Sequence, residues 1–328
     1  MMIWLRRGGM AAAIAGMLVL SSCIKFERQE MSYRYDKASD ELRIFQVYYG
    51  IQGDAAELTP EEIKQMDSVL DGQRTFFFAN WIFEYNRAQL EQMLVEGEKA
   101  SKATPPPAAE ELARFAAAKP LVELLIANVH VTNGQCFRDG ERELCGYQQV
   151  TLSHVSTVIA QANTTINAMV LALPPEAEDP AKAALVSGFQ AAARTGWTWI
   201  ARSGNALTVR VPMAYAGYRQ LRQTKAAELK AALGLPADPL AFDRARATFL
   251  PIVALLASEV DAGYIDHALQ VTLGHPGPEP VTLDLPVNLG TYTEGAATYL
   301  RPKVGIYDVD LAKVRSDFLT PPAAPATP

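Results

Sequence analysis

The stretch Val129–Leu152, VHVTNGQCFRDGERELCGYQQVTL, decides the fold because it can pair with itself in one register. With residues 139–142 as the loop, charged, apolar and cysteine residues all face complementary partners across two strands. The predicted pairs are Arg138 with Glu143, Phe137 with Leu144, Cys136 with Cys145, Val131 with Val150, and Val129 with Leu152. This agreement predicts an antiparallel β-hairpin, whose outer pairs a bulge near Gly134 or Gly146 would break.

Three further hairpins are predicted from alternating apolar residues bounded by turn residues. They are Met31–Tyr49 with a polar turn at 37–40, Trp197–Val211 with a turn at 203–205, and 269–273 paired with 281–285 across a loose turn. In the first of them, Tyr33 and Tyr35 are expected to face Ile44 and Leu42 on the partner strand.

Helical patterns fill the intervals between the hairpins. Thr59-Pro60-Glu61-Glu62 combines an N-cap, a proline in the first turn and acids at the positive end of the helix dipole. Other helices are expected over 80–98, 109–125, 153–173, 180–194, 214–233 and 242–260. The predicted fold class is therefore α+β, an antiparallel sheet built from about four β-hairpins and covered by helices.

The first 22 residues are typical of a signal peptide. Arg6 and Arg7 precede an apolar run, Met10–Leu20, which is shorter than the roughly 18 residues of a transmembrane helix. The run ends in Leu20-Ser21-Ser22-Cys23, an aliphatic residue and two small ones before a cysteine. This stretch resembles the lipobox of bacterial lipoproteins, and the resemblance covers only about the first 23 residues. It implies cleavage before Cys23 and attachment of diacylglycerol and a fatty acyl group such as palmitate to that residue.

The resemblance also implies a location in the bacterial cell envelope. Two or more acyl chains hold a protein stably on a bilayer, so the membrane itself is an expected partner. Ile24 stands where an aspartate retains enterobacterial lipoproteins in the inner membrane, so the outer membrane is favoured, with the periplasmic or surface side left open. Residues 23–30 would form a lipidated N-terminus and a short tether, at most ~25 Å long when extended.

The rest of the chain contains the folded region. We place it at residues 31–319, with a possible sub-boundary at the Pro-rich segment 102–108 and a disordered tail at 320–328. The composition, 49% hydrophobic in 328 residues, is sufficient for a folded core. A net charge of −6 with no cluster of Lys and Arg repels phosphate backbones, so no nucleic-acid partner is expected.

The cysteines are consistent with export. Cys136 and Cys145 are the only two besides Cys23, and an even pair in an oxidising compartment favours a disulfide. Their spacing fits neither a CxxC redox motif nor a zinc-ligand pair. We expect a bridge between them across neighbouring strands, with two buried thiols as the alternative.

Catalytic and cofactor motifs are missing from the sequence: it contains no GxSxG, HExxH, P-loop or GxGxxG. His130 and His154 could come together beside an acid as metal ligands, but solvated or packed histidines explain them more simply. Asp308 and Asp310 alternate as calcium ligands can, yet the Gly and Glu of an EF-hand loop are missing. We therefore expect no metal, no cofactor and no catalytic residue.

One pattern points to binding. Trp197 and Trp199 share a strand face with Arg210 across from them, an arrangement that could form an aromatic platform for sugar or peptide. The alternative is that a helix covers the two indoles as part of the core.

The function that fits these observations is a lipid-anchored envelope protein acting as a non-catalytic binding or scaffolding module for an envelope protein or glycan. An envelope hydrolase with a dispersed active site is the alternative.

Overall fold

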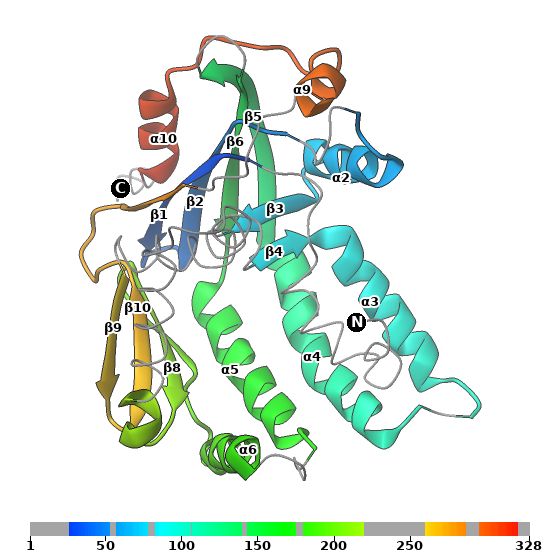
Figure 1. Cartoon of the computed structure of the whole chain (residues 1–328), viewed down its shortest axis with the longest axis vertical. Helices are drawn as coiled ribbons and strands as arrows, with labels where there is room; N and C mark the ends of the chain where they lie inside the picture. Colours follow the sequence, from blue (N-terminus) through cyan, green and yellow to red (C-terminus); the bar gives the residue numbers. More distant parts are fainter. Residues whose placement is uncertain are drawn as a thin grey trace, which may run out of the picture.

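The computed structural model describes residues 26–52, 57–77, 83–105, 107–139, 143–174, 180–219, 260–286 and 295–320. It confirms an α+β fold, in which a five-stranded and a four-stranded antiparallel sheet are packed with helices (Figure 1). The signal peptide, Cys23 and the C-terminal tail lie outside the described residues, as do most of the helices expected over 214–233 and 242–260.

The five-stranded sheet has the strand order β11-β1-β2-β6-β5. Its strands are β1 (Arg28–Asp36), β2 (Glu41–Tyr49), β5 (Val129–Asp139), β6 (Glu143–Leu152) and β11 (Val281–Pro286). The first predicted hairpin is confirmed, because Tyr33 pairs with Ile44 and Tyr35 with Leu42. Phe26 is already 1% exposed. The packed region therefore begins before the boundary expected at residue 31.

The β5–β6 hairpin contains a bulge that changes its register. Its outer pairs form as predicted, with Val131 opposite Val150 and Val129 opposite Leu152. Between Asn133 and Cys136 the register shifts by one residue. All predicted pairs nearer the turn are therefore wrong, since a bulge displaces every residue beyond it. The observed inner pairs are Cys136 with Gly146, Phe137 with Cys145, Arg138 with Leu144, and Asp139 with Glu143.

The shift places the two cysteines on opposite faces of the sheet. Cys136 packs with the cluster around Met66, whereas Cys145 packs with Phe45 and Phe137 on the other face. The expected bridge between Cys136 and Cys145 is corrected accordingly, because the structure contains no disulfide between them. Burial raises the pKa of the Cys136 thiol to about 11. At neutral pH this thiol is protonated and a weak nucleophile.

The four-stranded sheet has the order β7-β8-β10-β9. Its strands are β7 (Ile200–Ser203), β8 (Ala206–Pro212), β9 (Val260–Ile265) and β10 (Ala268–Leu273). The predicted β7–β8 hairpin forms, but the pairing of β10 with β11 is wrong. β10 instead pairs with β9 through a tight turn at Asp266 and His267, whose φ angles are 50° and 58°. The two-residue turn holds β9 beside β10, while the longer segment 274–280 carries the chain to β1 of the other sheet.

Helices complete the fold and cover the sheets. They are α2 (Pro60–Leu70), α3 (Arg87–Ser101), α4 (Ala109–Asn128), α5 (Val155–Leu171), α6 (Pro180–Arg194), α9 (Gly295–Leu300) and α10 (Leu311–Leu319). The predicted start of α2 is confirmed, since Thr59 and Glu62 form a reciprocal capping box. Helix α3 begins later than predicted because the residues before it form β4 (Phe83–Asn86), which pairs with β3 (Arg74–Phe77). Among the described residues, no helix is both long and apolar enough to cross a membrane.

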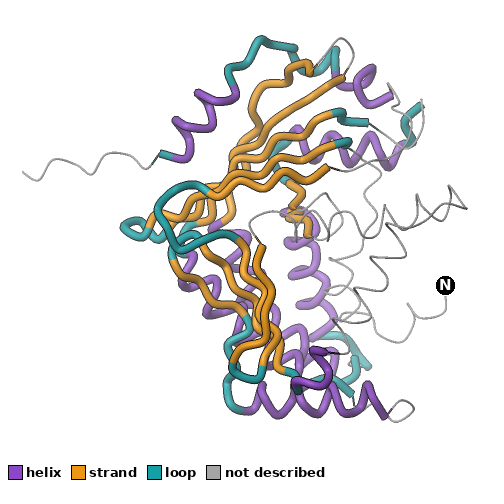
Figure 2. The backbone as a smooth tube through the Cα atoms, turned by 60° about the vertical axis from the view of Figure 1, so that its left-hand side comes forward, coloured by secondary structure: helices purple, strands orange, loops and turns teal. Residues whose placement is uncertain are grey.

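The two sheets lie one above the other and are joined by loops along one side (Figure 2), while α5 and α6 lie next to the smaller sheet and α4 packs against α5 (Figure 1). Helix α10 covers one face of the five-stranded sheet, packing Leu319 against Phe45 and Val47. The β3–β4 hairpin crosses the opposite face (Figure 1). The segment between α3 and α4, which contains most of 102–108, joins two helices that pack against each other.

A buried polar layer attaches β3 to the face of the five-stranded sheet. Because β3 crosses this face, it has no neighbouring sheet strand to satisfy its backbone on that side. Glutamine side chains provide the partners instead: Gln29 Nε2 donates to Phe76 O at 2.7 Å, and Gln148 Nε2 donates to Arg74 O at 3.0 Å. Both glutamines are almost completely buried. The layer separates an apolar cluster around Phe26 and Met66 from a second cluster around Met31 and Val150.

The packing of α3 on α4 allows a direct test. A Cβ atom placed on Gly97 would lie 2.0 Å from the ring of Phe115. We expect Gly97→Ala to destabilise the protein by about 1–3 kcal/mol through overpacking, although alanine favours a helix over glycine by ~1 kcal/mol. Gly188 in α6 is the matched control, with nothing within 4 Å of its Cβ position, so Gly188→Ala should stabilise. Urea unfolding compares the two variants, and a stabilising Gly97→Ala would contradict the contact.

Candidate functional site

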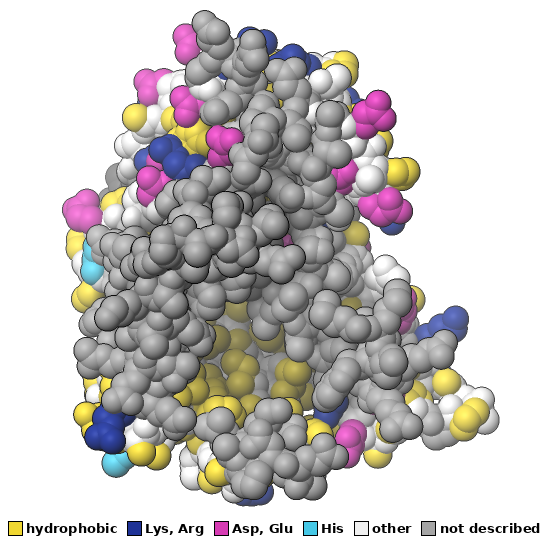
Figure 3. All heavy atoms as spheres, in the orientation of Figure 1, with side chains coloured by type: hydrophobic (Ala, Val, Ile, Leu, Met, Phe, Trp, Pro, Cys, Tyr) yellow, Lys and Arg dark blue, Asp and Glu magenta, His cyan; other side chains and the backbone are white. Residues whose placement is uncertain are grey.

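An apolar cavity of ≈ 450 Å³ lies between the two sheets, α4 and α5. Figure 3 shows hydrophobic side chains at the base of a hollow in the lower half of the face that is drawn. Small-molecule sites are typically about 300–1,000 Å³ in volume. An apolar cavity of only ~150 Å³ is known to bind benzene. The cavity is therefore large enough for an extended organic ligand.

Strand alternation builds the first wall of the cavity. Met31, Tyr33 and Tyr35 are every second residue of β1, so their side chains lie on one face of the sheet. Leu42 and Ile44 of β2 stand directly opposite Tyr35 and Tyr33 and extend the same face. Because successive side chains alternate, the polar residues between these positions point to the other side.

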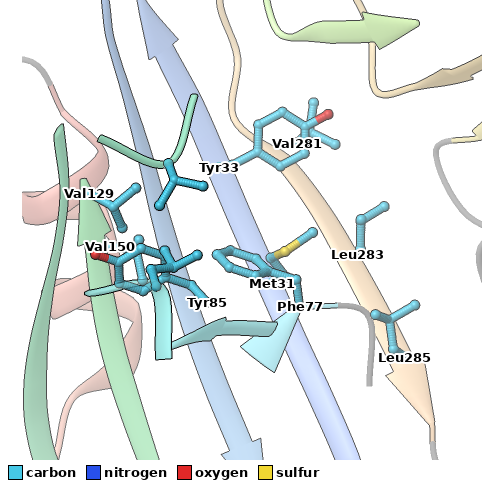
Figure 4. Packing of buried hydrophobic residues seen from close by; sticks show 11 residues of the cluster. Met31, Tyr33, Phe77, Tyr85, Val129, Val150, Val281, Leu283 and Leu285 are labelled. Carbon is cyan, nitrogen blue, oxygen red and sulfur yellow. The ribbon is translucent and has the colours of Figure 1, made fainter. Parts of the chain in front are cut away.

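The neighbouring part of the wall combines the larger sheet with the β3–β4 hairpin. Val129 and Val150 come from β5 and β6, while Phe77 and Tyr85 reach the cavity from the hairpin that crosses the sheet. Figure 4 shows Tyr85 extending toward Val129 and Val150, with Phe77 beside Met31. The hairpin thus closes the end of the cavity nearest the buried polar layer.

Helix α5 supplies the wall facing the sheet. Val155, Val158, Ile159 and Ala162 line the cavity, and their i, i+3, i+4, i+7 spacing forms one helical stripe. The first turn of α5 is fixed by Asp40, whose carboxylate accepts a hydrogen bond from Ser156 N at 3.1 Å. This acceptor replaces an ordinary N-cap, because the side chain of the N-cap residue makes no capping hydrogen bond.

The four-stranded sheet forms the remaining wall with Ile200, Leu207 and Leu273. Asn205, in the β7–β8 turn, joins the two sheets: its Oδ1 accepts from Tyr35 N at 2.6 Å, and its Nδ2 donates to two carbonyl oxygens of the 274–280 segment. These bonds hold the smaller sheet against β1. The relative position of the two walls is consequently fixed by hydrogen bonds as well as by packing.

The tyrosines on the cavity wall differ in hydrogen bonding. Tyr35 donates to Asp40 at 2.8 Å, and Tyr33 donates to the carbonyl of Leu273 at 3.1 Å. Tyr85 is 4% exposed, and its hydroxyl has no hydrogen-bond partner in the described part of the chain. Burial raises the pKa of the Tyr85 phenol, so it stays a neutral donor near pH 7. Buried polar groups are usually satisfied, and the Tyr85 hydroxyl is an exception among the described residues.

A second, smaller cavity of ≈ 200 Å³ lies beyond the polar layer, on the same face of the five-stranded sheet. Phe26, Met66 and Cys136 are among the residues that line it. The protonated thiol gives this cavity no reactive group. It is smaller than the usual range for ligand sites, and the larger cavity is the better candidate.

The residues predicted to form an aromatic platform are separated by the structure. Trp199 is 7% exposed, donates from Nε1 to Asn167 of α5 at 2.7 Å and packs edge-on against Phe189 of α6. The helices therefore cover it as core, which was the alternative interpretation. Trp197 is half-buried, and the Arg210 guanidinium lies 5.0 Å from its ring centroid. The pair holds the end of the β7–β8 hairpin together.

The histidines and acids singled out in the sequence do not converge. His130 and His154 are exposed, on β5 and at the start of α5, and His267 occupies the β9–β10 turn. Asp310 caps α10 by accepting from the Lys313 amide at 3.0 Å. Within the described ranges, no group of three His, Cys, Asp or Glu side chains is placed to hold a metal ion.

Sequence reasoning missed the cavity because its walls come from segments spread between residues 31 and 273. The local signals were present in the alternation of β1 and in the apolar stripe of α5. Nothing in the sequence indicated that these faces would meet around a space instead of filling it. In comparisons with protein-family models, curated proteins and solved structures, nothing matches this chain.

Proposed function

We propose that this protein is a lipid-anchored bacterial envelope protein that binds the acyl chain of a lipid in the cavity between its two sheets, without catalysing a reaction. The observation that carries the proposal is the combination of a ≈ 450 Å³ volume with a wall whose exposed surface is entirely apolar. Such a wall selects hydrocarbon and offers no group that would activate a substrate.

The energetics favour an occupied cavity. Leaving apolar surface in contact with water costs roughly 25 cal/mol per Å², and the wall of this cavity is lined mainly by apolar side chains. Water is a poor occupant, because a buried water needs two to four polar partners. A hydrocarbon chain removes this cost and is excluded from water itself, so both effects favour binding.

The anchor supports a lipid as the ligand. Phe26 is buried in the fold only three residues after the proposed attachment site at Cys23. Three residues span at most about 10 Å. A diacylglyceryl group on Cys23 would thus keep the folded region beside a bilayer, where acyl chains are the most abundant apolar ligand.

Filling the cavity should abolish binding. Ala162 lines the cavity from α5. We expect Ala162→Phe to lower the affinity for N-phenyl-1-naphthylamine, a neutral apolar fluorophore, by at least about tenfold, because the phenyl ring takes the ligand's space. Ala160→Phe, on the exposed side of the same helix, should bind like the unmodified protein. Fluorescence titration of the mature protein measures both. Absence of binding to the unmodified protein, or equal loss in both variants, would reject the cavity as the site.

A further inference from the structure

One short strand separates the two cavities on the face of the five-stranded sheet. Phe76 and Phe77 are consecutive residues of β3, so their side chains point to opposite sides. Phe76 lines the smaller cavity and Phe77 lines the larger one. Figure 4 shows Phe77 beside Met31, in the apolar cluster next to the larger cavity. β3 is therefore a partition whose two aromatic rings face two different spaces.

The partition is hydrogen-bonded into the buried polar layer. Phe76 O accepts from Gln29 Nε2 at 2.7 Å, and Phe76 N donates to the Tyr48 hydroxyl at 3.3 Å. Gln46 Nε2 donates to Thr75 Oγ1 at 2.7 Å, and both residues are fully buried. A methylene group that entered this layer would leave buried donors and acceptors without partners, which costs more than one methylene gains. A hydrocarbon chain in the larger cavity must therefore end at the layer.

We propose that Phe77 is the end wall of the acyl-chain site, so that the partition sets the chain length beyond which affinity stops rising. This inference rests on the proposed function and specifies the ligand as a single acyl chain of limited length. A cavity of ~150 Å³ holds benzene, which has six carbons. At the same volume per carbon, ≈ 450 Å³ holds one chain of roughly 18 carbons. The polar end of the ligand lies outside the wall, whose exposed surface is entirely apolar.

The test measures how saturated alkanoates, from dodecanoate to docosanoate, displace N-phenyl-1-naphthylamine from the mature protein. For the unmodified protein, we expect the affinity to rise about tenfold for every two added methylenes up to octadecanoate. It should then stay constant, because further methylenes remain in water. Phe77→Ala should bind docosanoate at least about tenfold more tightly than octadecanoate, since loss of the phenyl ring adds space for several carbons.

Phe76→Ala is the matched control. It makes the same change in the next residue of β3, on the side of the smaller cavity, so it should bind octadecanoate and docosanoate equally well. If no alkanoate displaces the fluorophore from the unmodified protein, the proposed function fails. If alkanoates displace it but the affinity levels off at the same length in Phe77→Ala, the cavity binds acyl chains and Phe77 is not the end wall. An equal shift in Phe76→Ala would contradict the partition.

A second pair of variants keeps more of each side chain, because loss of a buried phenyl ring can prevent folding. Phe77→Leu should bind docosanoate at least about threefold more tightly than octadecanoate, and Phe76→Leu should show no preference. The unmodified protein allows one more measurement, since a ligand stabilises the native state according to its affinity. The thermal shift should rise with chain length and level off at octadecanoate. A continued rise to docosanoate would contradict an end wall.

Discussion

Replacing Cys23 with alanine is expected to abolish lipidation. The protein should then leave the membrane fraction and partition into the aqueous phase instead of the detergent phase. Two or more acyl chains, at roughly 0.8 kcal/mol per buried CH₂, bind a protein to a bilayer almost completely. Cys23 is the residue that the lipobox-like stretch assigns as their attachment point. Loss of its thiol should therefore change partitioning from nearly all bound to nearly all released or mislocalised. Detergent phase separation of cell envelopes and intact mass measurement check this result.

Cys136→Ala is the control for this experiment, because Cys136 is a partly buried thiol in the folded region and its replacement leaves the lipobox intact. This variant should retain both the acyl mass and the membrane-bound fraction. A native protein whose mature N-terminus lies at another residue and carries no acyl chain would contradict the anchor. The cavity would then lose its argument from nearby lipid, although the binding experiments would still test it directly.

Local chemistry explains what the sequence predicted well. The β1–β2 register follows from alternating residues on either side of a short polar turn, and the pairing of Tyr33 with Ile44 needs no information from elsewhere. The start of α2 likewise follows from Thr59 and Glu62, which satisfy each other's backbone amides. In both cases, the residues that determine the structure lie within one element or one hairpin.

Non-local packing explains the errors. The bulge in β5 depends on the ring of Tyr147, because a Cβ on Gly134 would lie 1.9 Å from it. The pairing pattern in the sequence favoured a strand without a bulge. That register places Cys136 opposite Cys145, so it also predicted a disulfide. The partner of β10 was missed because β9 lies at the end of a segment whose apolar pattern was assigned to a helix. The cavity depends on the distance between two sheets, which no hairpin register specifies.

The buried polar layer was also invisible in the sequence, although it gives the largest expected effect on stability. Gln148 makes three hydrogen bonds inside the protein: its Nε2 donates to Arg74 O and to Asn133 Oδ1, and its Oε1 accepts from the Tyr48 hydroxyl at 2.9 Å. It is 2% exposed, so water cannot replace a lost partner. A polar side chain at this point of a strand normally faces solvent, and only the crossing of β3 over the sheet makes it internal.

Gln148→Met is therefore expected to lower the free energy of unfolding by roughly 2–4 kcal/mol. Methionine has a similar length, so the change removes the hydrogen bonds with little loss of volume, and each buried group left without a partner costs about 1–3 kcal/mol. The carbonyl of Arg74 is the most affected, because it belongs to the short strand that the layer holds on the sheet.

Gln149→Met is the control, since Gln149 is the next residue of β6, half-buried on the opposite face. Urea unfolding followed by circular dichroism should separate the two variants by at least about 2 kcal/mol. Equal stability would mean that β3 is held by apolar packing alone, and that the position of Tyr85 on the cavity wall does not depend on the glutamine layer.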